Sequence, residues 1–229
     1  MSLPGRLLLL AVFVPCASLP LKAGEPASSA GTPEVRKIME SFEGRGVMRD
    51  DSPPLPPAAA LQSFTLREGL EVDLIAAEPD VMQPVHLSFD SRGRLWVTQY
   101  LQYPFPAGVK IMSYDFHLRA MFDRVPEPPP RGVRGADKVT VFEDRDGDGT
   151  FESHRDVITG LNIATAAIKG AGGIWVLNPP YLLFYPDADD DDVPDGDPRV
   201  CLRGFGLEDT HSVASALQFG PDGWIYGAT

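Results

Sequence analysis

Stretches in which apolar and polar residues alternate recur along the chain from Leu87 onward, and most of them end in a turn. In three of them a glycine is followed by one variable residue, an aliphatic residue and an aromatic residue. These are Gly93/Leu95/Trp96, Gly172/Ile174/Trp175 and Gly223/Ile225/Tyr226. Around the first and third, an apolar strand enters a tight turn that ends in the glycine, which suits the bulge before the next strand. The pattern predicts β-hairpins whose aromatic residues pack in the core.

A second pattern alternates apolar residues into an aspartate-rich turn, in KVTVFEDRDGDGTFE from Lys138 and in YLLFYPDADDDDVPDG from Tyr181. Repeats of about 40 to 50 residues that consist of short antiparallel strands are typical of β-propeller blades. We therefore expect an all-β fold, a partial β-propeller of about three blades, with a β-sandwich as the alternative. The antiparallel strands are expected at 87–98, 138–143, 173–177, 182–185 and 217–226. An imperfect alternation over 70–79 predicts one more strand.

The chain divides into three parts. Arg6 is followed by an apolar run from Leu7 to Val14, which predicts a secretory signal peptide over residues 1–23. This run is much shorter than the roughly 20 residues that cross a bilayer, so no transmembrane span is expected beyond the signal peptide. Residues 24–60, rich in proline and alanine, are expected to form a disordered linker. Residues 61–229 form the predicted propeller, and the protein is expected in the periplasm or outside the cell.

Two features of the predicted domain suggest a larger functional unit. A segment interrupted by prolines, residues 100–137, separates the first two repeats and is expected to be an insertion within the first blade. A closed propeller needs four or more blades, whereas about three fit between residues 61 and 229. We therefore expect the chain to be part of a longer propeller.

The charge and composition of the chain exclude some classes of binding partner. The formal net charge is −12, from 20 Lys and Arg residues against 32 Asp and Glu residues, which disfavours nucleic acid and anionic membranes. The 23 prolines and 22 glycines favour short strands over helices. Removal of the signal peptide would leave Cys201 as the only cysteine, so no internal disulfide is expected.

The acidic turns are candidate calcium sites, with plain solvated turns as the alternative. Carboxylates at alternate positions followed by a glycine are how calcium loops gather oxygen ligands, although Arg155 stands where an EF-hand needs a glutamate. Many like charges in one loop also repel each other unless a cation or water separates them. The candidate ligands are Asp144, Asp146 and Asp148 in the first turn, with Glu152 as a further oxygen, and Asp187, Asp189, Asp191 and Asp195 in the second.

Other candidate residues have simpler interpretations. His86, His117 and His154 lack a second ligand at metal-site spacing and are interpreted as ordinary histidines. Asn178, which precedes two prolines, is interpreted as a turn residue.

Four stretches together resemble the N-terminal propeller of the large putative membrane-bound dehydrogenases of planctomycetes. They are MQPVHLSFDSRGRLWVTQY, GADKVTVFEDRDGDGTFE, GGIWVLNPPYLLFYPDADDDDVPDGDP and GFGLEDTHSVASALQFGPDGWIYGAT. Those proteins are more distantly similar to glucose and sorbosone dehydrogenases, which bind pyrroloquinoline quinone (PQQ) in a six-bladed propeller. The resemblance implies a sugar or alcohol substrate, PQQ in the complete protein and an electron acceptor such as a c-type cytochrome. The chain has no Cys-x-x-Cys-His motif, so no haem is assigned to it.

The resemblance also implies a catalytic residue. In the quinone dehydrogenases a histidine before a strand that ends in Gly-Pro-Asp is the general base, and His211 precedes LQFGPDG in the same way, one residue further away. Three hypotheses follow. The first is a piece of an exported quinone-dependent sugar or alcohol dehydrogenase-like propeller, with His211 as the base. The second is a non-catalytic propeller that binds carbohydrate or protein, and the third is a structural module stiffened by calcium.

Overall fold

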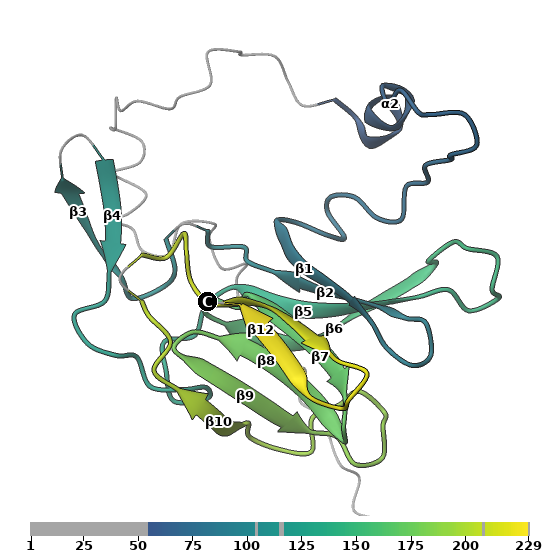
Figure 1. The fold of residues 1–229 in the computed structure, drawn as a ribbon. Coiled ribbons are helices and arrows are strands. Elements are labelled where there is room, and N and C mark those ends of the chain that lie inside the picture. Colours follow the sequence, from purple (N-terminus) through teal and green to yellow (C-terminus); the bar gives the residue numbers. More distant parts are fainter. Residues whose placement is uncertain (1–54, 104, 115–116, 208, 229) are drawn as a thin grey trace, which may run out of the picture.

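The structure is a computed structural model that describes residues 55–229 except 104, 115–116, 208 and 229 (Figure 1). The predicted signal peptide and almost all of the predicted linker lie outside the described residues. Between 111 and 121 only the course of the backbone is described. None of the helices described here is both long and apolar enough to span a membrane.

The fold is all-β with antiparallel pairing, as predicted. The described part contains one short helix, α2 (Pro57–Gln62), and twelve strands. The strands are β1 (Pro84–Phe89), β2 (Leu95–Gln99), β3 (Lys110–Tyr114), β4 (His117–Met121), β5 (Asp137–Glu143), β6 (Ser153–Leu161), β7 (Ala166–Gly170), β8 (Gly173–Asn178), β9 (Tyr181–Pro186), β10 (Arg199–Arg203), β11 (Ser215–Phe219) and β12 (Ile225–Ala228).

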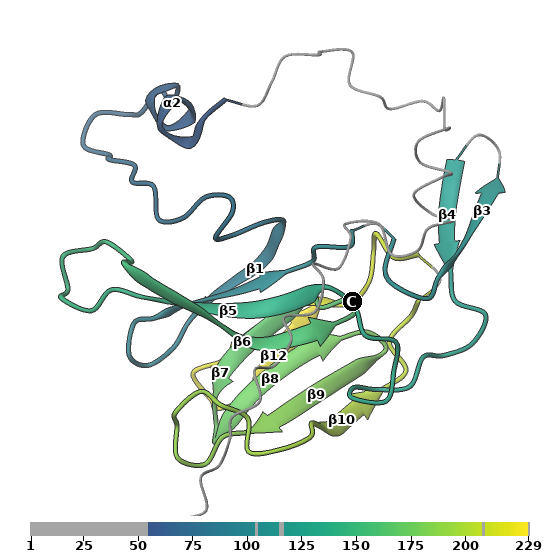
Figure 2. The same ribbon diagram turned by 180° about the vertical axis from the view of Figure 1, so that it is seen from behind.

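Two of the sheets have the same topology. The first has the strand order β1-β2-β5-β6 and the second β10-β9-β8-β7. Each sheet is an antiparallel meander, in which neighbouring strands also follow one another along the chain, apart from the hairpin between β2 and β5. The hairpin β3–β4 is inserted between β2 and β5, and β11 and β12 form a separate two-stranded sheet. Figures 1 and 2 show this insertion projecting away from the sheets.

The predicted hairpins and acidic-turn strands are confirmed, because each coincides with a strand to within a few residues. The strand predicted over 70–79 is wrong: residues 71–77 have no regular structure, and 78–80 form a turn. Leu70, Leu74 and Ile75 are exposed, so the alternation in this segment has no neighbouring strand to pair with among the described residues.

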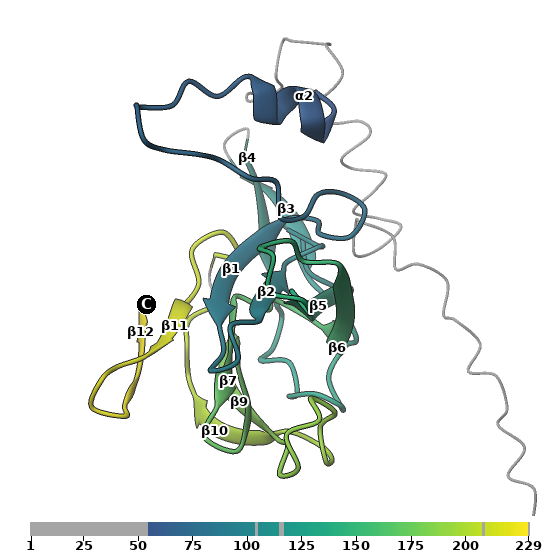
Figure 3. The ribbon, with the colours of Figure 1, turned by 90° about the vertical axis from the view of Figure 1, so that its right-hand side faces the viewer.

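The sheets pack face to face in chain order (Figure 3). Buried side chains of β2, β5 and β6 meet those of β8 and β9 in one cluster, and β11 packs on the second sheet through Ala214 and Leu217. The first strands of the three sheets lie next to one another. His86 Nε2 on β1 is 3.0 Å from the carbonyl oxygen of Leu217 on β11, and Ser88 Oγ on β1 donates to the carbonyl of Ala167 on β7 at 2.9 Å.

The three repeated aromatic residues have different environments. Trp96 is buried at 1% exposure, and Trp175 is half-buried against Phe184. The prediction that Tyr226 lies in the core is wrong, since its ring is 55% exposed and its hydroxyl donates to Asp222 at 2.7 Å. The first two aromatic residues have a neighbouring sheet to pack against, whereas β12 pairs only with β11 among the described strands.

Candidate functional site

The chemistry of the molecule divides between two ends of the sheets. In an antiparallel meander every second connection lies at the same end. One end carries the acidic turns β5–β6 and β9–β10. The other end carries the β2–β5 insertion and the connections β6–β7 and β10–β11, the last of which contains His211. Contacts among these connections agree with the alignment. The side-chain amide of Asn162 accepts the N–H of Ala107 in the insertion and donates to its carbonyl, both at 2.9 Å, and Thr165 Oγ1 donates to Ala214 O at 2.7 Å.

His211 forms a pair with a carboxylate. Its Nδ1 lies 2.8 Å from Asp209 Oδ1, and its backbone N–H donates to the same oxygen at 3.0 Å. Both side chains are exposed, at 41% and 54%. An aspartate that accepts from Nδ1–H fixes the neutral tautomer whose lone pair is on Nε2. His211 therefore has the arrangement of a base whose proton-accepting nitrogen is accessible to a ligand.

The insertion provides the neighbour of this pair. The ring of Tyr103 contacts the imidazole of His211 edge to face, with centroids 5.3 Å apart, and Tyr100 contacts Tyr103 in the same manner at 5.5 Å. The start of the insertion is held by buried Asp137, which accepts from the N–H groups of Gln102 and Ala164. Asp137 thus connects the start of the insertion, which contains Tyr103, to the β6–β7 connection.

The first acidic turn brings its predicted ligands together. Carboxylate oxygens of Asp144, Asp146, Asp148 and Glu152 all lie within 4.8 Å of one another. The loop is shaped by its own backbone: Asp144 accepts from the N–H groups of Gly147 and Gly149 at 2.7 and 2.8 Å. The N–H of Asp148 lowers the pKa of Asp146, but the charge of Asp148, desolvation, and the charge and hydrogen bond of Glu152 together outweigh it, so that pKa is raised. A bound cation would relieve this repulsion.

The second acidic turn is different because basic side chains from both sheets bind it. Asp187, Asp189 and Asp191 each have one carboxylate oxygen within 4.8 Å of those of the other two. Asp195 does not belong to this group, and its Oδ2 accepts from the N–H of Ala188 at 2.7 Å. Asp187 is also bonded to the buried ammonium of Lys169. Two of the predicted ligands of this loop, Asp187 and Asp195, therefore already take part in ion pairs or hydrogen bonds within the protein.

Buried Asp192 is the centre of this ion-pair cluster. Arg94 binds it with two nitrogens at 2.5 and 2.8 Å, and Arg155 Nη2 binds it at 2.6 Å. Lys169 and Arg92 approach it at 3.4 and 3.6 Å. Burial alone would raise the pKa of Asp192, but Arg94, then Lys169 and Arg155, lower it to about 2. The cluster joins the β1–β2 turn and β6 of the first sheet to the second sheet.

Sequence reasoning missed both partners of the strongest of these pairs. Asp192 stands in a run of aspartates in which nothing local distinguishes it, and Arg94 stands in a turn whose most evident feature is its glycine. The available signal was the Asp-x-x-x-Arg spacing from Asp90 to Arg94, which forms a 2.8 Å ion pair beside Trp96.

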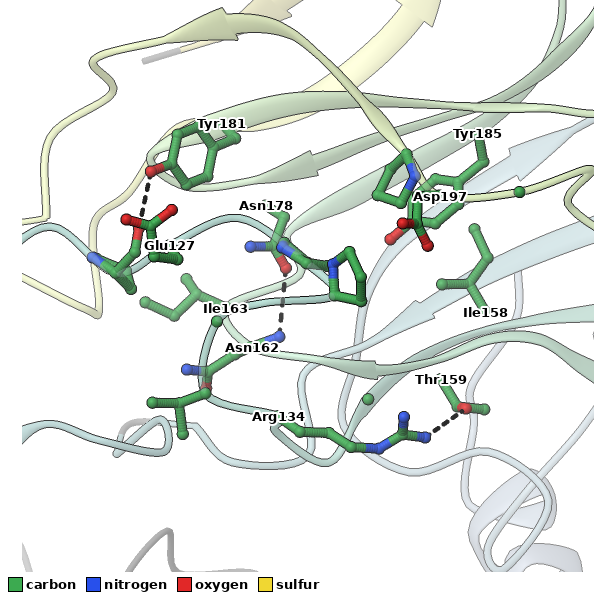
Figure 4. A pocket seen from close by; sticks show the side chains of 18 of the residues that line it. Glu127, Arg134, Ile158, Thr159, Asn162, Ile163, Asn178, Tyr181, Tyr185 and Asp197 are labelled. Atoms are coloured by element: carbon green, nitrogen blue, oxygen red, sulfur yellow. Dashed lines mark hydrogen bonds between the residues drawn. The ribbon is translucent and has the colours of Figure 1, made fainter. Parts of the chain in front are cut away.

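A cavity of about 200 Å³ lies where the end of the insertion covers β6, β8 and β9 (Figure 4). Its apolar walls include Ile163 and Tyr181, and its polar groups include Arg134, Asn178 and Asp197. Asn178 was interpreted as a turn residue; it is the last residue of β8, is buried, and accepts the N–H of Asn162 through Oδ1 at 3.3 Å.

The remaining histidines have structural environments. His86 is half-buried with its Nε2 at Leu217 O; burial lowers its pKa more than the backbone contacts raise it. His154 stacks on Phe142 at 5.2 Å and lies 3.8 Å from Asp80. The side chain of His117 lies outside the described side chains.

Of three comparisons with known proteins, one finds a match. No curated protein and no solved structure shows significant similarity to it. A family model described as "Domain of unknown function (DUF7133)" matches residues 56–229, a range that spans all the described strands and both acidic turns. The chain therefore belongs to the DUF7133 family.

Proposed function

We propose that the chain is part of an exported β-propeller of the dehydrogenase type, in which His211 is the general base toward a sugar or alcohol hydroxyl. The observation that carries the proposal is the pair of His211 and Asp209 at 2.8 Å, exposed on the connection that leads into β11. The sheet topology supports the propeller, because meanders that stack face to face with their first strands adjacent have the arrangement of consecutive blades.

Proton transfer would proceed through Nε2 of His211. The hydroxyl proton of the substrate moves to the lone pair on Nε2, while Nδ1–H stays bonded to Asp209. The carboxylate stabilises the imidazolium that forms, because it lies next to the new positive charge. Tyr103 restricts the imidazole from the side and provides an apolar edge against which a substrate ring could lie.

The described residues do not by themselves fit PQQ, the electron acceptor that the resemblance implies. PQQ carries carboxylates and needs cationic partners, whereas the contacts described for the His211 ring are with an aspartate and a tyrosine. The proposal for these residues therefore covers the proton transfer, and the quinone stays an expectation for the complete protein.

Replacing His211 with glutamine is expected to lower turnover by about 100-fold or more, because the side chain loses its proton-accepting nitrogen. The measurement is dye-linked oxidation of a panel of sugars and alcohols by the complete gene product, supplied with PQQ and calcium. The thermal stability of the variant should match that of the parent, since His211 is exposed.

A matched control is His154→Gln, which alters another exposed histidine near an aspartate at the opposite end of the sheets. It should leave turnover within about twofold. Equal turnover of His211→Gln and the parent would exclude His211 as the base. Absence of quinone binding by the parent would favour the non-catalytic binding platform.

We further propose that the first acidic turn binds calcium, and we expect the ion to raise the melting temperature by a few degrees through binding to the folded state. Asp146→Ala should remove the increase, because Asp146 belongs to the exposed carboxylate group. Asp189→Ala tests the second turn separately. A melting temperature that does not respond to calcium in the parent would leave both loops as solvated turns.

A further inference from the structure

We infer that the cavity in Figure 4 is a binding site for a small zwitterion, a free α-amino acid of about the size of leucine. The inference does not depend on His211 or on the dehydrogenase proposal, because His211 does not line this cavity.

The cavity has the size and wall of a small-ligand site. Its volume of about 200 Å³ is below that of drug-sized pockets, which start near 300 Å³, so it suits one small molecule. Buried Ile158, Ile163 and Tyr181 form an apolar wall. An aliphatic side chain of the ligand would bury its surface against these three residues.

The charged groups of the cavity have opposite signs and lie on opposite walls. Figure 4 shows Arg134 at the bottom and Asp197 at the upper right, with Ile163 and Tyr181 to one side of both; Arg134 and Asp197 are exposed residues of the cavity lining. Neither forms an ion pair of 4.0 Å or less with another described residue. Asp197 also lies close enough to Tyr185, which lines the same cavity, for its charge to raise the pKa of that hydroxyl, second to the effect of burial. A ligand with one carboxylate and one ammonium group would satisfy both residues.

The backbone makes room for the guanidinium of Arg134. Gly160 on β6 has φ of +76°, and a Cβ atom there would lie 2.6 Å from Arg134 Cζ. One guanidinium nitrogen, Nη2, donates to Thr159 Oγ1 at 3.2 Å, which orients the group and leaves its other N–H donors for a ligand. Arg134 can therefore bind a carboxylate with two parallel hydrogen bonds.

The insertion closes the cavity and is tied to the second sheet. Tyr181 donates its hydroxyl hydrogen to the carbonyl of Pro126 at 2.7 Å. The proline-rich segment that follows reaches Arg134, so the wall that carries the cation belongs to the insertion and the wall that carries Asp197 belongs to the β9–β10 loop. A zwitterion would bridge the two segments.

Other ligand classes fit less well. A phosphate compound would meet the carboxylates of Glu127 and Asp197 as well as one arginine. A purely apolar ligand would contact the apolar wall but form no hydrogen bond with Arg134 or Asp197. A neutral sugar could hydrogen-bond to both residues but would bring no charge of opposite sign, and charge-assisted hydrogen bonds are stronger than neutral ones.

The test uses leucine and two analogues that each lack one charge, measured by calorimetry on the purified chain. 3-Methylbutan-1-amine lacks the carboxylate, and 4-methylpentanoic acid lacks the ammonium group. Leucine is expected to bind at least about tenfold more tightly than either analogue, because each analogue loses one charged hydrogen-bonded contact.

Two variants locate the contacts. Arg134→Met should weaken leucine binding by about tenfold and abolish the preference for leucine over the amine, while the preference over the acid persists. Asp197→Asn should show the reverse. Arg131→Met is the matched control, because Arg131 lies three residues before Arg134 and does not line the cavity. This variant should bind leucine within about twofold of the parent.

Three results would overturn the inference. The first is no binding of leucine at about 10 mM, the second is equal binding of leucine and both analogues, and the third is a preference that Arg134→Met and Asp197→Asn leave unchanged. Binding of glucose more tightly than leucine would also overturn it and would assign the cavity to neutral sugars. The leucine-binding results do not depend on whether His211 supports oxidation of a sugar or alcohol, so either proposal can be rejected without the other.

Discussion

Replacing Asp192 with asparagine is expected to lower the free energy of unfolding by about 3 kcal/mol or more. The carboxylate is 2% exposed and accepts two hydrogen bonds from Arg94 and one from Arg155. Its removal leaves the nearly buried cations of Arg94 and Lys169 near an amide instead of a full negative charge. The loss of a partner from a buried ion pair costs more than the pair itself contributes, because the remaining charge stays desolvated.

Asparagine is the appropriate replacement because the backbone restricts the choice. Asp192 has φ of 64°, a left-handed conformation that asparagine and aspartate tolerate better than alanine. The substitution therefore changes the charge while it preserves the shape and backbone preference of the residue. The measurement is urea unfolding followed by fluorescence, with the slope checked for a two-state transition.

Two comparisons make the result specific. Asp189→Asn changes an exposed aspartate three residues earlier and should cost no more than about 0.5 kcal/mol. Combining Asp192→Asn with Arg94→Met should cost clearly less than the sum of the single changes, because the unpaired guanidinium is removed as well. Additive losses, or an Asp192→Asn variant as stable as the parent, would show that the cluster does not hold the sheets together.

Raising the pH from about 4 to about 8 is expected to destabilise the protein through Asp137, by up to about 4 kcal/mol. Burial raises the pKa of Asp137 from 3.8 to about 7, although N–H groups of Ala164 and Gln102 act in the opposite direction. The folded state therefore retains a proton that the unfolded chain releases above 3.8. Stability from this group is fully present below that value and is lost as the pH rises through about 7.

Asp137→Asn isolates this contribution. The variant is less stable overall, because an amide offers one acceptor oxygen where the carboxyl group has two oxygens, each of which accepts an N–H. Its stability should nevertheless lack the decline between about pH 4 and 7 that the parent shows. His86 contributes with the opposite sign, since its lowered pKa makes stability rise with pH below 6.5, and it does so equally in both proteins. Parallel stability profiles of parent and variant would contradict the assignment.

At the acidic end the sign is reversed. Asp192, with its pKa lowered to about 2, stabilises the fold above its ordinary value of 3.8 and loses this effect as the pH falls toward 2. The contributions of Asp137 and Asp192 together place maximal stability at mildly acidic pH.

The sequence by itself determined the strands and the turns that join them. Glycines at left-handed turn positions, such as Gly93 and Gly223, and apolar alternation in β5 and β9 are local features, and each strand carries its own pattern. The same locality explains why the first acidic turn was found, since its carboxylates are neighbours along the chain. The pairing of His211 with Asp209, two residues away, was accessible for the same reason.

Only the tertiary structure decided which residues are buried and which charges meet. The alternation over 70–79 resembles a strand, yet no described strand pairs with it, so propensity alone could not settle its state. Arg94 and Asp192 are 98 residues apart, as are Arg92 and Asp190, and the cavity joins residues of the insertion to the β9–β10 loop. Such contacts depend on how the sheets stack, a property of the whole chain that local patterns of polarity do not encode.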